Sequence, residues 1–133
     1  MKRVAAYGTA IVLAHLLIAI PHGIAHTNLH IGLSDLQNLF VLLVINVCPL
    51  IAMALLWTRY QRAGIVLLSL SMGASLLFGV WNHFVVNGPD HVAEVAPGAM
   101  GHLFQLTAVL LALTEAVGAW LGLVWFRRSS QAL

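Results

Sequence analysis

The amino-acid sequence predicts an all-α integral membrane protein, a single domain of residues 1–133 folded as an antiparallel bundle of four transmembrane helices. Of its 133 residues, 61% are hydrophobic and only 8% are charged, whereas soluble domains carry about 45–50% apolar and about 25% charged residues. Four apolar segments recur along the chain, each close to the length of about 20 residues that crosses the hydrocarbon core of a bilayer. This composition excludes a soluble globular domain, and we expect no nucleic-acid partner.

We expect the four helices at about residues 3–26, 36–57, 64–84 and 100–126. Lys2 and Arg3 precede the first apolar run, a pattern shared with cleaved signal peptides. That run is longer than the apolar region of a typical signal peptide, so we interpret it as a retained helix. Ser34 is the expected N-cap of the second helix. A short basic connection separates the second helix from the third, and Pro97-Gly98 precedes the fourth.

The basic residues predict the orientation of the bundle. In a chain of four spans, the N-terminus, the second connection and the C-terminus lie on one side of the membrane. The Lys and Arg content of connections marks the cytoplasmic side, so both termini are expected there. The chain is therefore predicted to be a multi-pass protein of a plasma membrane, specifically a prokaryotic inner membrane, with the lipid bilayer as its surroundings. All six basic residues obey this pattern: Lys2, Arg3, Arg59, Arg62, Arg127 and Arg128.

Six of the seven histidines fall on the opposite, outer side under this topology. His22 and His26 lie four residues apart at the end of the first helix, and therefore on one helical face. His83 ends the third helix, and His102 begins the fourth. Imidazole is the commonest protein ligand for transition metals, and it suits copper, zinc and iron alike. The sequence therefore predicts an outer metal site of these four histidines, holding copper, zinc or non-haem iron.

The third connection adds further donors in the stretch GPDHVAE. We expect Asp90, His91 and Glu94 to act as additional ligands or as hydrogen-bond acceptors for the ligand histidines. The stretch HGIAH, which begins at His22, lacks the glutamate of the HExxH zinc-protease motif. The sequence therefore gives no support to a zinc protease.

Haem b is the alternative cofactor, with its axial ligands drawn from His22, His83 and His102. Three classes of function follow, and only the first two need a cofactor. The first is transition-metal binding for redox chemistry, for metal handling or, as a metal-dependent membrane oxidoreductase, for oxidation of a lipid-soluble substrate such as a quinol. The second is a small b-type cytochrome that moves electrons in the membrane, and the third is a non-catalytic subunit or assembly factor of a homo-oligomer or larger membrane complex. The sequence identifies no catalytic residue.

Glu115 is the one acidic residue deep inside an apolar segment. An ionisable group in the hydrocarbon region is costly unless it is paired or neutral. His15 lies twelve residues from Arg3, and Glu115 lies twelve residues from Arg127, so both side chains are expected at similar depth. We therefore predict a contact between His15 and Glu115, either as an interhelical pair or as part of a proton path.

Overall fold

The computed structural model describes residues 2–130, and every regular element within that range is helical. Four continuous stretches are long and apolar enough to cross a membrane: Lys2–Asn28, Asp35–Leu56, Gln61–Val85 and Ala99–Arg128. Each predicted helix is therefore present, with its ends within about one helical turn of the expected positions. The elements are α1 (Lys2–Asn28), α2 (Asp35–Phe40), η1 (Val41–Val47), α3 (Cys48–Leu56), α4 (Gln61–Val80), η2 (Trp81–Val85) and α5 (Ala99–Ser130).

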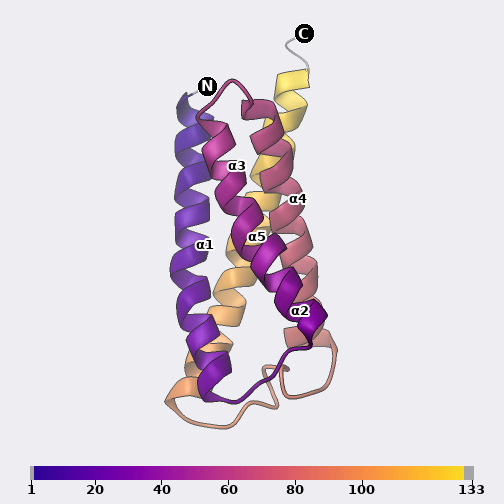
Figure 1. Cartoon of the computed structure of the whole chain (residues 1–133). Helices are drawn as coiled ribbons and strands as arrows, with labels where there is room; N and C mark the ends of the chain where they lie inside the picture. The colour runs from indigo at the N-terminus through magenta and orange to yellow at the C-terminus, as the bar shows by residue number, and fades with distance from the viewer. Residues whose placement is uncertain (1, 131–133) are drawn as a thin grey trace.

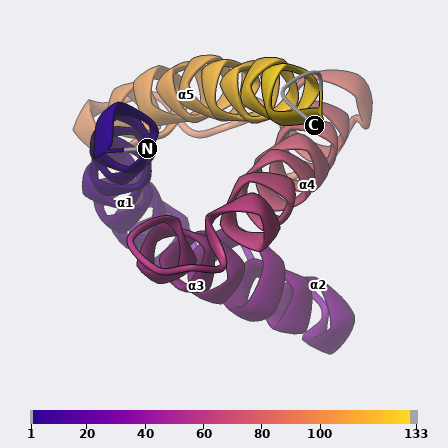
Figure 2. The same ribbon diagram turned by 90° about the horizontal axis from the view of Figure 1, so that it is seen from above.

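The helices run side by side along the length of the molecule (Figure 1). The first turn of α1, the last turns of α5 and the connection between α3 and α4 lie together at one end, which we call the terminal end. The connections between α1 and α2 and between η2 and α5 lie at the other, the loop end. Figure 2 shows α1, α3, α4 and α5 arranged around a centre, with α2 leaning outward from that arrangement.

The second span contains the π-helical segment η1 between α2 and α3. Ser34 caps α2 as predicted, because its hydroxyl accepts from the backbone N–H of Gln37 while the Gln37 side chain accepts from the Ser34 backbone. Through η1 the backbone follows π-helical spacing, and the Cys48 N–H donates to the Leu43 carbonyl five residues back. Pro49 follows directly and has no N–H to continue the ordinary ladder. Within η1, the Asn46 side chain also donates to the Val41 carbonyl, at 2.7 Å.

The two ends of the bundle have separate apolar cores. Near the terminal end, Val12, Leu56, Leu68 and Met72 are almost fully buried together. At Gly118 of α5, an added Cβ would lie 2.9 Å from Met72 Cγ, so α4 and α5 approach one another closely there. Near the loop end, a smaller core consists of Ala25, Ile31 and Phe104. Three histidine rings described below pack against Phe104 of this smaller core.

Candidate metal centre

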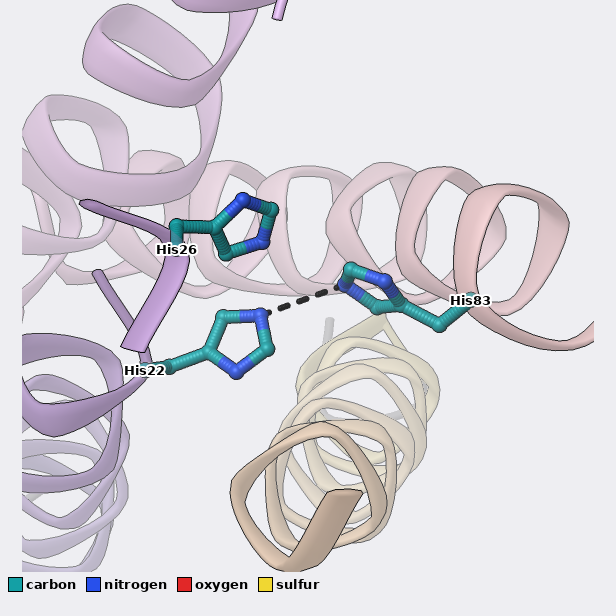
Figure 3. A group of neighbouring side chains, drawn as sticks. All are labelled: His22, His26 and His83. Atoms are coloured by element: carbon teal, nitrogen blue, oxygen red, sulfur yellow. Dashed lines mark hydrogen bonds between the residues drawn. The ribbon is translucent and has the colours of Figure 1, made fainter. Parts of the chain in front are cut away.

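Three histidines converge near the loop end of the bundle. His22 and His26 come from successive turns of α1, and His83 comes from η2. One ring nitrogen from each lies within 4.8 Å of the others, which is close enough for all three to hold one metal ion. Figure 3 shows the His22 and His26 rings on one side and the His83 ring facing them. We refer to these three residues as the histidine cluster.

Hydrogen bonds to Nδ1 fix which nitrogen of His22 and His83 points into the cluster. The Thr107 hydroxyl donates to the Leu103 carbonyl at 2.6 Å, so it accepts from His22 Nδ1–H at 2.8 Å. His83 Nδ1–H donates to the backbone carbonyl of Asp90 at 3.0 Å. With both Nδ1 atoms protonated, Nε2 of each neutral ring carries the lone pair that can bind a metal.

These two nitrogens are close neighbours. His22 Nε2 and His83 Nε2 lie 3.3 Å apart, joined by the dashed line in Figure 3. That contact is a hydrogen bond only if one ring carries a second proton and becomes imidazolium. A metal ion accepts both lone pairs without a second proton on either ring. In a tetrahedral site with metal–nitrogen bonds of about 2.0–2.1 Å, two nitrogen ligands lie about 3.3–3.4 Å apart. The observed spacing equals that of two adjacent ligands.

Asp90 adds a buried carboxylate beside the histidine cluster. Its Oδ1 lies 3.3 Å from His26 Nε2 and 3.2 Å from His83 Nδ1. Neither contact has hydrogen-bonding geometry, and both carboxylate oxygens are buried without a hydrogen-bond partner, as is Nδ1 of His26. A buried carboxylate without compensation costs several kcal/mol. A cation held by the three histidines would supply that compensation.

Phe104 of α5 holds the three rings in place. Its side chain is completely buried. Its ring centroid lies 4.9 Å from that of His22, 5.1 Å from that of His26 and 5.2 Å from that of His83. The His22 ring stacks on it, and the His83 ring meets it edge to face. One aromatic side chain therefore restricts all three imidazoles to their observed rotamers.

The end of α1 shapes the chain around the cluster. His30 adopts a left-handed conformation with φ of 54°, and its N–H donates to the Thr27 carbonyl while Ile31 N–H donates to the His26 carbonyl. This is the Schellman arrangement that ends many helices. It turns Ile31 back into the small core with Ala25 and Phe104. His30 is therefore a helix-ending residue, and its side chain is exposed.

The π-helical segment η2 and the loop that follows it place Asp90 beside the histidine cluster. Val86 N–H donates to the Trp81 carbonyl five residues back, which closes the π-helical turn that carries His83. Such turns occur frequently at functional sites. Further along the chain, Val92 N–H donates to the His83 carbonyl at 3.0 Å. This bond folds the loop back across the end of α4, and Asp90 therefore lies beside the histidine it orients.

The structure brings together three of the four histidines predicted as metal ligands and leaves out the fourth. His102 is exposed and does not belong to the cluster. The residues of α5 that face the cluster are Phe104 and Thr107. Because each helical residue adds about 100°, position 102 lies about 200° from position 104 and about 140° from position 107. The expectation that His102 contributes a ligand therefore placed it on the wrong face of α5.

The three polar residues expected in the third connection also separate. Asp90 lies against the cluster, as described above. His91 instead accepts from the Ala93 N–H through its own Nδ1 at 3.2 Å, and Glu94 is exposed. Neither is among the residues that converge on the histidines. Thr107 and Phe104, by contrast, were not identified from the sequence. The one available signal was the spacing of three residues between them, which places both on the same face of α5.

The predicted contact between His15 and Glu115 is present at mid-bundle, deeper than the cluster. His15 Nε2 lies 3.1 Å from Glu115 Oε1, and both residues are buried. His15 Nδ1 is buried without a partner. An unpaired lone pair there is less costly than an unpaired N–H, so Nε2–H is the donor to the carboxylate. We call these two residues the mid-bundle pair.

A cavity of about 470 Å³ connects the two polar groups. The histidine cluster and Asp90 border it toward the loop end, and Glu115 borders it toward the middle of the bundle. Its walls come from all four spans and are largely apolar, with Ile45, Phe78 and Leu111 among them. This volume is within the range of about 300–1,000 Å³ typical of small-molecule sites.

Comparison of the chain with models of protein families, with curated proteins and with solved structures finds no match. The functional argument therefore depends on the geometry of the site.

Proposed function

We propose that this chain is an integral membrane protein that binds one transition-metal ion through His22, His26 and His83. Asp90 lies against the ligand histidines as a fourth ligand or as an acceptor that orients them. The observation that carries this proposal is the 3.3 Å distance between Nε2 of His22 and Nε2 of His83, because a metal ion satisfies both nitrogens at that spacing. The Asp90 carboxylate, which is buried without a hydrogen bond beside His26 and His83, also supports the proposal.

The geometry favours a bare metal ion over haem b. A porphyrin separates its two axial ligands, which lie on opposite faces of the macrocycle. Here the three imidazole centroids are only 4.8, 5.0 and 5.8 Å apart. Zinc, copper and iron all bind imidazole with a carboxylate nearby, so elemental analysis is needed to identify the metal.

Elemental analysis tests the proposal directly. The protein is purified in mild detergent without a chelator or a histidine tag, and its metal content is measured beside that of His22→Ala and His102→Ala. We expect near-stoichiometric metal in the parent and in His102→Ala, because His102 lies outside the cluster. His22→Ala should lose the metal while retaining its helix content by circular dichroism. An equal metal content in His22→Ala and the parent would reject the site.

We further propose that the bundle is antiparallel, with the terminal end cytoplasmic and the loop end outside. The placement of all six Lys and Arg residues supports this orientation. Labelling with a membrane-impermeant maleimide tests it in intact cells of a Cys48→Ser background. Glu94→Cys, in the loop after η2, should react from outside, and Arg59→Cys, between α3 and α4, should react only after the membrane is opened. The reverse pattern would place the metal site on the cytoplasmic side.

A further inference from the structure

The cavity between the histidine cluster and the mid-bundle pair has polar groups at its two ends and apolar walls between them. Gly79 of α4 lies where these ends approach. An added Cβ at Gly79 would be 3.9 Å from His83 Cδ2 and 3.8 Å from Glu115 Oε2. The His83 ring and the Glu115 carboxylate are therefore no more than 7.7 Å apart. The two polar ends of the cavity therefore lie close together beside Gly79.

The two ends differ in chemistry. At the loop end, the histidine cluster offers nitrogen lone pairs and, under the proposed function, a metal ion. At the other end, Glu115 Oε1 accepts from His15, while Oε2 lies toward Gly79 and the cavity. A carboxylate oxygen in an apolar cavity is a strong acceptor for an O–H donor. Asn46 and Ser75 also line the cavity, but both side chains already donate to backbone carbonyls.

We propose that this cavity binds a lipid-soluble hydroquinone, with one ring oxygen at the histidine cluster and the opposite hydroxyl donating to Glu115. The apolar walls favour an aromatic ring over a charged or strongly hydrated ligand. The bilayer supplies such molecules, because only apolar compounds concentrate in it. This inference deepens the proposed function, since it takes the metal ion as the contact for the first oxygen.

A matched pair of substitutions on α5 tests the cavity. Ala112 lines it and Ala116 does not, although they lie one turn apart on the same helix and Ala116 is exposed. The probe is a short-chain benzoquinol, and its equilibrium binding to purified, metal-loaded protein is measured under anaerobic conditions. We expect Ala112→Leu to weaken binding at least tenfold because the added side chain occupies the ring position. Ala116→Leu should bind like the parent.

A matched ligand and a third variant test the polar contact. The dimethyl ether of the same benzoquinol has no O–H donor, and it should bind at least tenfold more weakly than the benzoquinol. Glu115→Gln should weaken benzoquinol binding about tenfold, since a neutral acceptor forms a weaker hydrogen bond than a carboxylate. The same variant should leave binding of the dimethyl ether unchanged.

Metal content is measured in every sample, so failure of the metal site is seen separately from failure of the cavity. The hydroquinone proposal is overturned if the metal-loaded parent shows no saturable binding. It is also overturned if Ala112→Leu and Ala116→Leu bind equally, or if the dimethyl ether binds as well as the benzoquinol. A parent without metal that still binds benzoquinol, and loses it in Ala112→Leu, would reject the metal site and retain the cavity.

Discussion

The histidine cluster and the mid-bundle pair both place titratable side chains inside an apolar helical bundle. In the mid-bundle pair, one donor meets one acceptor at 3.1 Å, while His15 Nδ1 is buried without a partner and Glu115 Oε2 faces the cavity. In the cluster, the two unprotonated Nε2 atoms lie 3.3 Å apart, and both oxygens of Asp90 are buried without a hydrogen bond. Both regions contain histidine and a carboxylate. They differ in how many of these polar atoms form a hydrogen bond within their own region.

This difference shows that residue type alone does not identify a candidate metal site. A histidine beside a carboxylate can be a self-sufficient interhelical contact, which membrane bundles use to hold helices together. Histidines whose remaining nitrogens converge, after their other nitrogens have donated elsewhere, form a ligand set. The hydrogen bonds to Thr107 and to the Asp90 carbonyl create this convergence. Metal binding should therefore depend on the cluster and its hydrogen-bond partners, and should be insensitive to the mid-bundle pair.

The largest expected effect is the loss of one ligand. His83→Ala should lower metal affinity at least 100-fold, since even the loss of a residue that only orients a ligand costs about 10–100-fold. His15→Ala, which removes a buried histidine of the mid-bundle pair, should leave the affinity within about threefold of the parent. Competition with a fluorescent chelator measures both. Equal losses in the two variants would show that metal content reports general damage to the bundle.

Asp90→Asn is the next change in order of size. The amide keeps the shape of the side chain and the backbone carbonyl that orients His83, but it removes the negative charge beside the cluster. Metal affinity should fall about 10–100-fold in the same chelator assay. Glu94→Gln is the matched control, because it removes an exposed acid from the same loop, and it should behave like the parent. If Asp90→Asn binds metal as tightly as the parent, Asp90 contributes to the site only through its backbone carbonyl.

Thr107→Val should have a smaller effect of about tenfold on metal affinity. The valine fills the same space but offers no acceptor to His22 Nδ1–H, so His22 loses the bond that fixes its tautomer. Thr114→Val is the control on the same helix, since the Thr114 hydroxyl donates only to the Leu110 carbonyl one turn back. If Thr107→Val and Thr114→Val bind metal equally well, the tautomer argument for His22 is wrong.

Much of this architecture follows from the sequence. Apolar runs of about 20 residues have one stable conformation in a bilayer, since a helix satisfies its backbone internally. The four spans could therefore be predicted with their approximate ends. The contact between His15 and Glu115 could also be predicted, because equal distances from the basic ends put them at one depth. Both inferences need only position along a helix.

The candidate site was harder to predict because it depends on helix rotation and loop conformation. His102 has the right residue type at the right depth, but α5 turns it away from the cluster and presents Phe104 and Thr107 instead. Asp90 and Glu94 looked equivalent in the sequence, and they are distinguished by the way the loop folds back onto His83 through Val92 N–H and the Asp90 carbonyl. Rotation about a helix axis is set by packing along the whole helix, which a short motif does not encode.

The smallest expected effect concerns the mid-bundle pair itself. His15→Leu and Glu115→Leu each leave one polar partner buried alone and should lower the free energy of unfolding, measured by denaturation in mixed detergent micelles. The double variant removes both polar groups, so it should be more stable than the sum of the single losses predicts. We expect a coupling free energy of about 0.6 kcal/mol, the average found for interhelical hydrogen bonds in a membrane protein, and no more than the maximum of about 1.7 kcal/mol. A coupling near zero, with metal affinity unchanged in all three variants, would mean that His15 and Glu115 lie side by side without stabilising the bundle. A coupling accompanied by loss of metal would instead join the two polar regions into one functional unit, and the contrast between them would no longer hold.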